Sequence, residues 1–169
     1  MTLDAAKVTP LLWQGARPPE GTDLAKRGFA SVVLCAAEHQ PGPKHFPGLD
    51  AVISVPLHDG GAMFPPPEGE LVAAMEAAGI VSGVVGEGGK VLVTCNMGYN
   101  RSGLVTALAL MRLQRSKSTD DIIASIRAVR PGALSNPFFV DFLKSVDRKK
   151  LAPYQRRRAM PKRARAGRP

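Results

Sequence analysis

The feature that most constrains the fold is a stretch in which two apolar runs flank a short polar loop. The first run, KVLVTC at residues 90–95, is short and rich in branched side chains, as expected of a strand buried on both faces. The second run, from about Ser102 to Ser116, is apolar nearly all round, which predicts a central helix. A buried strand that leads directly into a buried helix favours a layered α/β fold.

The same alternation of strand and helix patterns runs along the chain. Further strands are predicted at residues 11–15, 30–35 and 51–55. Helices are predicted at residues 22–28, 68–85, 102–116, 118–129 and 135–146, with caps at Thr22, Ser118 or Thr119, and Asn136. The last helix is expected to continue toward Lys150. The pattern predicts a single α/β domain with a central, mostly parallel, twisted sheet flanked by helices.

The loop between the two apolar runs, TCNMGYNRSG, has the residues to bind a tetrahedral anion. A helix start supplies unpaired amides and a partial positive charge, and Gly98 permits close backbone approach. Arg101 can grip two phosphate oxygens with its planar fork. These surroundings favour the thiolate of Cys95, a nucleophile for phosphoryl transfer, and the Ser102 hydroxyl can donate to its sulfur. The candidate phosphate-binding residues are Asn96, Met97, Gly98, Tyr99, Asn100 and Arg101.

The loop matches the motif C-x5-R-[ST] as CNMGYNRS, and the chain thereby resembles the cysteine-dependent dual-specificity phosphatases of the protein tyrosine phosphatase superfamily. The resemblance extends in order through VTPLLWQGARPP, RGFASVVLCAAE, AVISVPLHD and RPGALSNPFFVDFL, over about residues 8–145. It implies a protein tyrosine phosphatase-like fold. It also implies hydrolysis of phosphotyrosine, and of phosphoserine or phosphothreonine as further substrates, through a phosphocysteine intermediate. The chain departs from the family at Thr94, where histidine usually precedes the cysteine.

A general acid is also needed, because an alkoxide or phenoxide leaves poorly without a proton. The resemblance assigns this role by position to Asp59, which lies 36 residues before Cys95. The glycines and prolines that follow Asp59 suit a loop that closes over substrate, although they also suit a simple turn. Ser135 and Asn136 resemble the family residues that brace the phosphate loop, and Asn136 equally suits a helix cap.

Two other functions fit parts of the pattern. An RNA 5′-triphosphatase of the same superfamily often has the loop C-x-x-G-x-N-R-[ST]-G, and CNMGYNRSG fits it with Asn100 and Gly103 in place. That branch, however, tends not to use the acid that Asp59 supplies. A non-catalytic phosphate-binding module is the other alternative, but such proteins lose the cysteine, the arginine or the acid, and this chain keeps all three. A lipid phosphatase is disfavoured because residues 96–100 contain no Lys or Arg.

The formal net charge of +9 is concentrated at the C-terminal end of the chain. From Asp147 onward there are ten Lys/Arg and one Asp, whereas residues 1–146 carry 13 basic and 13 acidic side chains. We expect residues 1–150 to form the catalytic domain and residues 151–169 to form a basic, disordered tail. Such a tail suits an anionic partner, either RNA or a membrane surface, besides a plain solubilising role.

Cysteine and histidine usage bears on location and cofactors. The chain has only two cysteines, no run of about 18 apolar residues and no secretory pattern at its start, so a cytoplasmic location is expected. Cys35 is either a core residue or a partner for Cys95 in a protective disulfide. His45 and His58 are secondary candidates for the acid and better suited to the surface. No histidine lies at metal-ligand spacing, so neither a metal nor another cofactor is expected.

Overall fold

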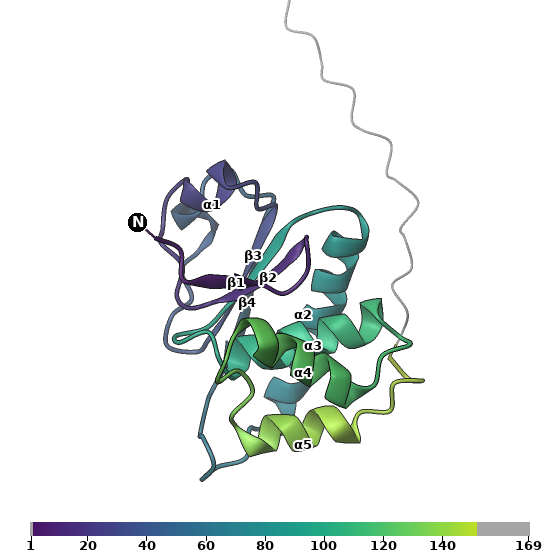
Figure 1. Cartoon of the computed structure of the whole chain (residues 1–169). Coiled ribbons are helices and arrows are strands. Elements are labelled where there is room, and N and C mark those ends of the chain that lie inside the picture. Colours follow the sequence, from purple (N-terminus) through teal and green to yellow (C-terminus); the bar gives the residue numbers. More distant parts are fainter. Residues whose placement is uncertain (1, 152–169) are drawn as a thin grey trace, which may run out of the picture.

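The computed structural model describes residues 2–151, and these residues form a five-stranded sheet with helices on both faces (Figure 1). The strand order is β1-β2-β5-β3-β4, with β1 antiparallel to β2 and every other neighbouring pair parallel. The strands are Ala5–Lys7 (β1), Leu12–Gly15 (β2), Ser31–Ala36 (β3), Ala51–Leu57 (β4) and Val91–Thr94 (β5). The predicted α/β class and mostly parallel sheet are confirmed. The predicted tail lies outside the described residues, apart from Leu151.

Strand β1 is not predicted from the sequence, because AAK lacks the branched and aromatic side chains that mark strands. Pairing with β2 forms this strand. Ala5 pairs with Gly15 and Lys7 pairs with Trp13, which places β1 at the edge of the sheet. Tertiary pairing therefore overrides weak local propensity at this position.

The helices follow the predicted order with small shifts in their ends. They are Asp23–Lys26 (α1), Glu68–Gly86 (α2), Arg101–Leu113 (α3), Thr119–Val129 (α4) and Pro137–Ser145 (α5), with a 3₁₀ turn at Pro43–His45 (η1). Ser118 and Asn136 cap α4 and α5 through their side chains, as predicted, whereas Thr22 makes no side-chain cap.

The expected continuation of the last helix toward Lys150 is wrong. Helix α5 ends at Ser145 because Val146 takes up an extended conformation. Asp147 then accepts a hydrogen bond from the backbone N–H of Lys149 at 3.0 Å, the local bond that favours a turn over a helix.

The core lies on both faces of the sheet. Helices α2 and α3 pack against the sheet on one face, and α4 and α5 cover α3 from outside (Figure 1). Every residue from 101 to 111 of α3 is buried, which agrees with the predicted central helix. A smaller cluster under α1 and η1, including Leu24, Phe29 and Phe46, covers the other face.

Helix α2 is the one helix within residues 2–151 that is long and apolar enough to cross a membrane, with a mean hydropathy of 1.4. Core helices of globular proteins pass the same test, so this is weak evidence for a span. Here α2 packs against α3 and β4, and its buried side includes Ala74, Ala78 and Val81.

The parallel strands bring three polar segments to one edge of the sheet. Glu38 follows β3, Asp59 follows β4 and Cys95 follows β5, so all three lie beyond the carboxyl ends of parallel strands. Ligands bind at this edge in open α/β sheets, because the loops there converge while the strands stay rigid. The fold therefore gathers distant residues around the start of α3.

Candidate active site

The loop from Cys95 to Asn100 wraps around the sulfur of Cys95. The Gly98 amide donates to Cys95 Sγ at 3.2 Å, and the Ser102 hydroxyl lies 3.3 Å from the same atom. Cys95 is 5% exposed and Ser102 is fully buried. The sulfur therefore sits at the floor of the loop with hydrogen-bond donors that stabilise a negative charge on it.

Two side chains hold the loop from outside by binding its carbonyl oxygens. Arg130, just after α4, donates to the carbonyls of Met97 at 2.9 Å and Gly98 at 2.7 Å. Gln14 on β2 donates to the Gly98 carbonyl at 2.9 Å. In a trans peptide the N–H points opposite to the C=O, so the following amides face the interior of the loop. Inward amides are what a bound phosphate requires.

Gly98 is required at its position by both conformation and space. Its φ of +73° lies in the left-handed region that side chains disfavour. A Cβ at residue 98 would lie 2.4 Å from the carbonyl carbon of Gly15 and 2.6 Å from the nitrogen of Ala16. The absence of a side chain at residue 98 brings the loop against the end of β2, whereas the close approach of the loop backbone to a phosphate stays a prediction.

Arg101 is the first residue of α3. The two terminal nitrogens of its guanidinium bond to the protein, whereas, in the described part of the chain, the Nε–H does not. Nη1 and Nη2 donate to the two carboxylate oxygens of Glu38 at 2.5 and 2.8 Å, and Nη1 also donates to the Leu57 carbonyl at 3.1 Å. The Nε–H is buried and finds no partner within residues 2–151. A buried donor without a partner is costly, and a phosphate oxygen in the loop would satisfy it.

Glu38 and Arg101 stabilise each other's charge. The hydrogen bond from Arg101 is the main cause that lowers the pKa of Glu38 to about 2. Burial acts to lower the pKa of Arg101, but the bond to Glu38 and the nearby Cys95 raise it overall. The arginine therefore stays charged, and its fork is fixed in one orientation.

Asp59 faces the same site from the loop after β4. Asp59 and Arg101 both line a cavity of about 490 Å³. Its other lining residues are Glu38, His58, Gly60, Phe64 and Pro65 to Pro67. Asp59 Oδ1 accepts hydrogen bonds from Asn136 Nδ2 at 2.8 Å and from the Gly61 amide at 3.2 Å. His58 is held away by Glu70, 2.6 Å from His58 Nδ1. Asp59 is therefore placed beside the arginine on which the phosphate is expected to bind.

The residues expected to brace the phosphate loop reach it through Asn100. The Ser135 hydroxyl and the backbone N–H of Asn136 donate to Asn100 Oδ1 at 3.1 and 2.9 Å. Thr94, by contrast, uses its hydroxyl to bond the Val33 carbonyl of β3 at 2.8 Å. Thr94 thus ties the strands together behind the loop. Met97 is 61% exposed, whereas Tyr99 is 36% exposed and its ring lies 5.2 Å from the Arg130 guanidinium.

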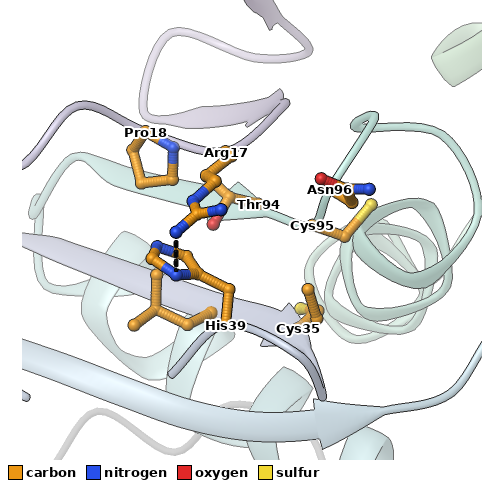
Figure 2. Close-up of a pocket in the computed structure, with 9 residues that line it drawn as sticks. Arg17, Pro18, Cys35, His39, Thr94, Cys95 and Asn96 are labelled. Atoms are coloured by element: carbon orange, nitrogen blue, oxygen red, sulfur yellow. Dashed lines mark hydrogen bonds between the residues drawn. The ribbon is translucent and has the colours of Figure 1, made fainter. Parts of the chain in front are cut away.

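A second, small cavity of about 10 Å³ lies behind the loop (Figure 2). Cys35 from β3 and Cys95 both line it, and both are free thiols. Burial raises the pKa of Cys35 well above its usual value, and the neighbouring Cys95 adds to this effect. Arg17 and His39, 2.5 Å apart between Nη2 and Nδ1, border the same cavity (Figure 2). Cys35 is thus protonated and buried, and its redox role stays a prediction.

Four residues of this arrangement were missed by sequence reasoning: Glu38, Arg130, Gln14 and Asp4. Asp4 pairs with Arg130 at 2.8 Å, and that hydrogen bond is the main cause that lowers the pKa of Asp4. Glu38 had a usable signal, because it lies three residues after the predicted strand 30–35, at the carboxyl edge of the parallel sheet where ligands bind. The other three carry no local pattern.

Known proteins resemble this chain in sequence and in fold. The family model for the dual specificity phosphatase catalytic domain matches residues 23–149. Mouse dual specificity phosphatase 28 is 36% identical over 138 residues, which cover 78% of this chain and 76% of that protein. A mouse dual specificity phosphatase structure complexed with zinc tungstate is 31% identical with a TM-score of 0.70, over 85% of this chain and 86% of that one. Human DUSP28 is 29% identical with a TM-score of 0.69, over 85% and 93%.

The chain belongs to the dual-specificity phosphatase family of the protein tyrosine phosphatase superfamily. It is a cysteine-dependent protein phosphatase, a hydrolase that acts on phosphoproteins, and the family's phosphocysteine intermediate fits its loop. The RNA triphosphatase and the non-catalytic module are not favoured by these relatives. Within residues 2–151 no group of three or more His, Cys, Asp or Glu is placed to hold a metal ion.

Proposed function

We propose that the chain hydrolyses phosphotyrosine in proteins, with Cys95 as nucleophile, Arg101 as phosphate ligand and Asp59 as general acid. The observation that carries the proposal is that Arg101 meets both other residues at one edge of the sheet: it shares a cavity with Asp59, and it interacts electrostatically with Cys95, which follows β5. The unpartnered Nε–H of Arg101 and the inward amides of residues 98 and 99 bind the phosphate.

In the first half of the reaction the Cys95 thiolate attacks phosphorus and forms the S–P bond. The bond between phosphorus and the tyrosyl oxygen breaks, and its electron pair goes to that oxygen. Asp59 transfers its proton there, so the phenol leaves neutral. Arg101 and the loop amides stabilise the charge on the equatorial phosphate oxygens during this step.

In the second half a water molecule attacks phosphorus and the Asp59 carboxylate takes its proton. The S–P bond breaks, and its electron pair returns to Cys95 as the thiolate. The Ser102 hydroxyl, 3.3 Å from Sγ, donates to the departing sulfur and eases this step. Inorganic phosphate is released, and Asp59 is protonated again for the next cycle.

A preference for phosphotyrosine follows from the depth of the site. Cys95 is 5% and Arg101 7% exposed, so phosphorus must travel inward before the sulfur reaches it. A phosphotyrosyl side chain is long enough to do this, whereas a phosphoseryl group is shorter by a ring. Phe64 and the three prolines of the adjoining cavity offer apolar contacts for that ring.

A panel of three substrates tests this proposal: one peptide sequence carrying phosphotyrosine, the same peptide carrying phosphothreonine, and RNA ending in a 5′-triphosphate. We expect kcat/KM on the phosphotyrosyl peptide to exceed that on the phosphothreonyl peptide at least tenfold, and no release of phosphate from RNA. Turnover of the triphosphate above that of both peptides would overturn the assignment.

We also propose a cytoplasmic location and an anionic partner, RNA or a membrane surface, for the basic segment that follows Asp147. Ten Lys and Arg between residues 148 and 169 support the anionic partner, because such charge density binds polyanions. Residues 1–146 carry 13 basic and 13 acidic side chains, so the residues from Asp147 onward supply the whole net charge.

A further inference from the structure

We infer that Asn136 is the positioning residue of the general acid, and that it makes Oδ2 the oxygen of Asp59 that carries the catalytic proton. The inference rests on the proposed role of Asp59. It goes beyond the bracing role expected of Asn136, because it connects this residue to the acid as well as to the phosphate loop.

The hydrogen bonds at Asp59 distinguish its two oxygens. Oδ1 accepts from Asn136 Nδ2 at 2.8 Å and from the Gly61 amide at 3.2 Å. Both partners are donors, so Oδ1 must act as an acceptor and cannot also hold a proton pointing at them. When Asp59 is protonated the proton therefore resides on Oδ2, which is left for the leaving group.

The orientation of the Asn136 amide is fixed independently of Asp59. Its Oδ1 accepts from the Phe138 amide at 3.0 Å as the cap of α5, so the NH₂ group must point the other way. Asn136 is 2% exposed, which leaves its side chain little freedom to flip. The donor that faces Asp59 is thus set by the helix start.

Asn136 also contacts the phosphate loop, through its backbone amide and Asn100 Oδ1 at 2.9 Å. Asn136 thereby joins the loop that binds phosphate to the loop that supplies the proton. Asp59 in the second loop lies 77 residues from Asn136 in sequence. Asp59 itself is exposed and followed by two glycines, so this bond limits a segment with much conformational freedom.

The test uses the full chain and two substrates that differ in their need for a proton. Phenyl phosphate has a poor leaving group, whereas 2,4-dinitrophenyl phosphate releases its phenol unaided. Asn136→Ser keeps an oxygen to cap α5 but does not reach Asp59. We expect it to lower kcat on phenyl phosphate about fivefold, to change KM less than twofold, and to spare turnover of the dinitrophenyl ester.

A double-mutant cycle isolates the coupling to Asp59. In an Asp59→Asn background, Asn136→Ser should cost less than twofold further on phenyl phosphate, because the acid it positions is gone. Asn136→Thr, which keeps a capping oxygen, adds no charge and places no N–H beside Asp59, should reproduce the selective loss. Ser118→Ala removes a comparable cap at the far end of α4 and should leave the ratio of the two substrates unchanged.

Equal losses on both substrates, or the same loss with and without Asp59, would overturn the inference and leave Asn136 with a structural role. If Asp59→Asn itself reduced turnover of both esters equally, the proposed acid would be wrong and the inference would fail with it. A selective loss in Asp59→Asn without one in either Asn136 variant would overturn the inference alone.

Discussion

Arg101 carries the positive charge of the site on a side chain that is 7% exposed, and Glu38 compensates that charge while leaving Nε for the substrate. Cys95 and Arg101 were predictable from sequence because both stand in one short motif. The pairing of Glu38 with Arg101 was not, since this bond spans 63 residues and depends on how β3 and β5 pair. The spacing of residues in a short motif identifies the reacting groups Cys95 and Arg101. The fold decides which distant carboxylate, here Glu38, pairs with the arginine.

The Glu38–Arg101 pair predicts a pH-dependent contribution to stability. The folded pKa of Glu38 is about 2, below its usual 4.5, so the contribution is present above about pH 4.5 and is lost as pH falls toward 2. We expect Glu38→Gln to lower the free energy of unfolding at pH 7 by about 1 kcal/mol at most, because the Glu38 side chain is 52% exposed and screened. Urea unfolding at pH 7 and near pH 2.5 checks this. A deficit that stays constant with pH would contradict it.

At the scale of elements, the phosphate loop is held at its ends and along its outer side. Strand β5 and helix α3 fix its two ends, and Arg130, in the segment after α4, binds its outward carbonyls. The order of strands and helices was predictable because apolar periodicity is a local property. Strand β1 and the end of α5 were not, since the first depends on pairing with β2 and the second on the turn at Asp147.

Arg130 offers a test of how the loop is held. Arg130→Lys keeps a positive charge but cannot reproduce the planar fork that binds two carbonyls, so the inward amides should lose their alignment. We expect kcat/KM on an aryl phosphate and the affinity for vanadate to fall about tenfold, with folding retained. Asp4→Asn is the matched control, because it weakens the ion pair alone and should cost less than half as much in kcat/KM. Equal losses would assign the effect to the ion pair.

At the scale of the molecule, the chain continues past α5 and closes on the far end of α3. Leu151 is 2% exposed, and its carbonyl accepts from Arg115 at 2.8 Å. Arg148 donates to the carbonyls of Met111 and Gln114 at the same end. Helix α3 has 13 residues, so this closure lies about 20 Å from Cys95. The basic segment therefore starts far from the reacting groups.

Truncation separates catalysis from the basic segment. A chain ending at Pro153 should turn over a small aryl phosphate within twofold of the full chain, since it retains Leu151 and the site. The full chain, but not the truncated one, should bind RNA or anionic vesicles with an affinity that falls steeply with salt. Binding that is independent of salt, or equal binding by both chains, would contradict the anionic-partner proposal. Ending the chain at Val146 should instead lower the melting temperature, because Arg148 and Leu151 are lost.

The central claim is that phosphate passes through the sulfur of Cys95. The most direct measurement is acid quenching of the full chain during turnover of an aryl phosphate, followed by mass spectrometry of its peptides. We expect one phosphate on the peptide that contains Cys95, none elsewhere, and neither phosphorylation nor turnover in Cys95→Ser, because a serine hydroxyl is not ionised there. Phosphate on another residue, or steady-state turnover by pure Cys95→Ser, would contradict the account.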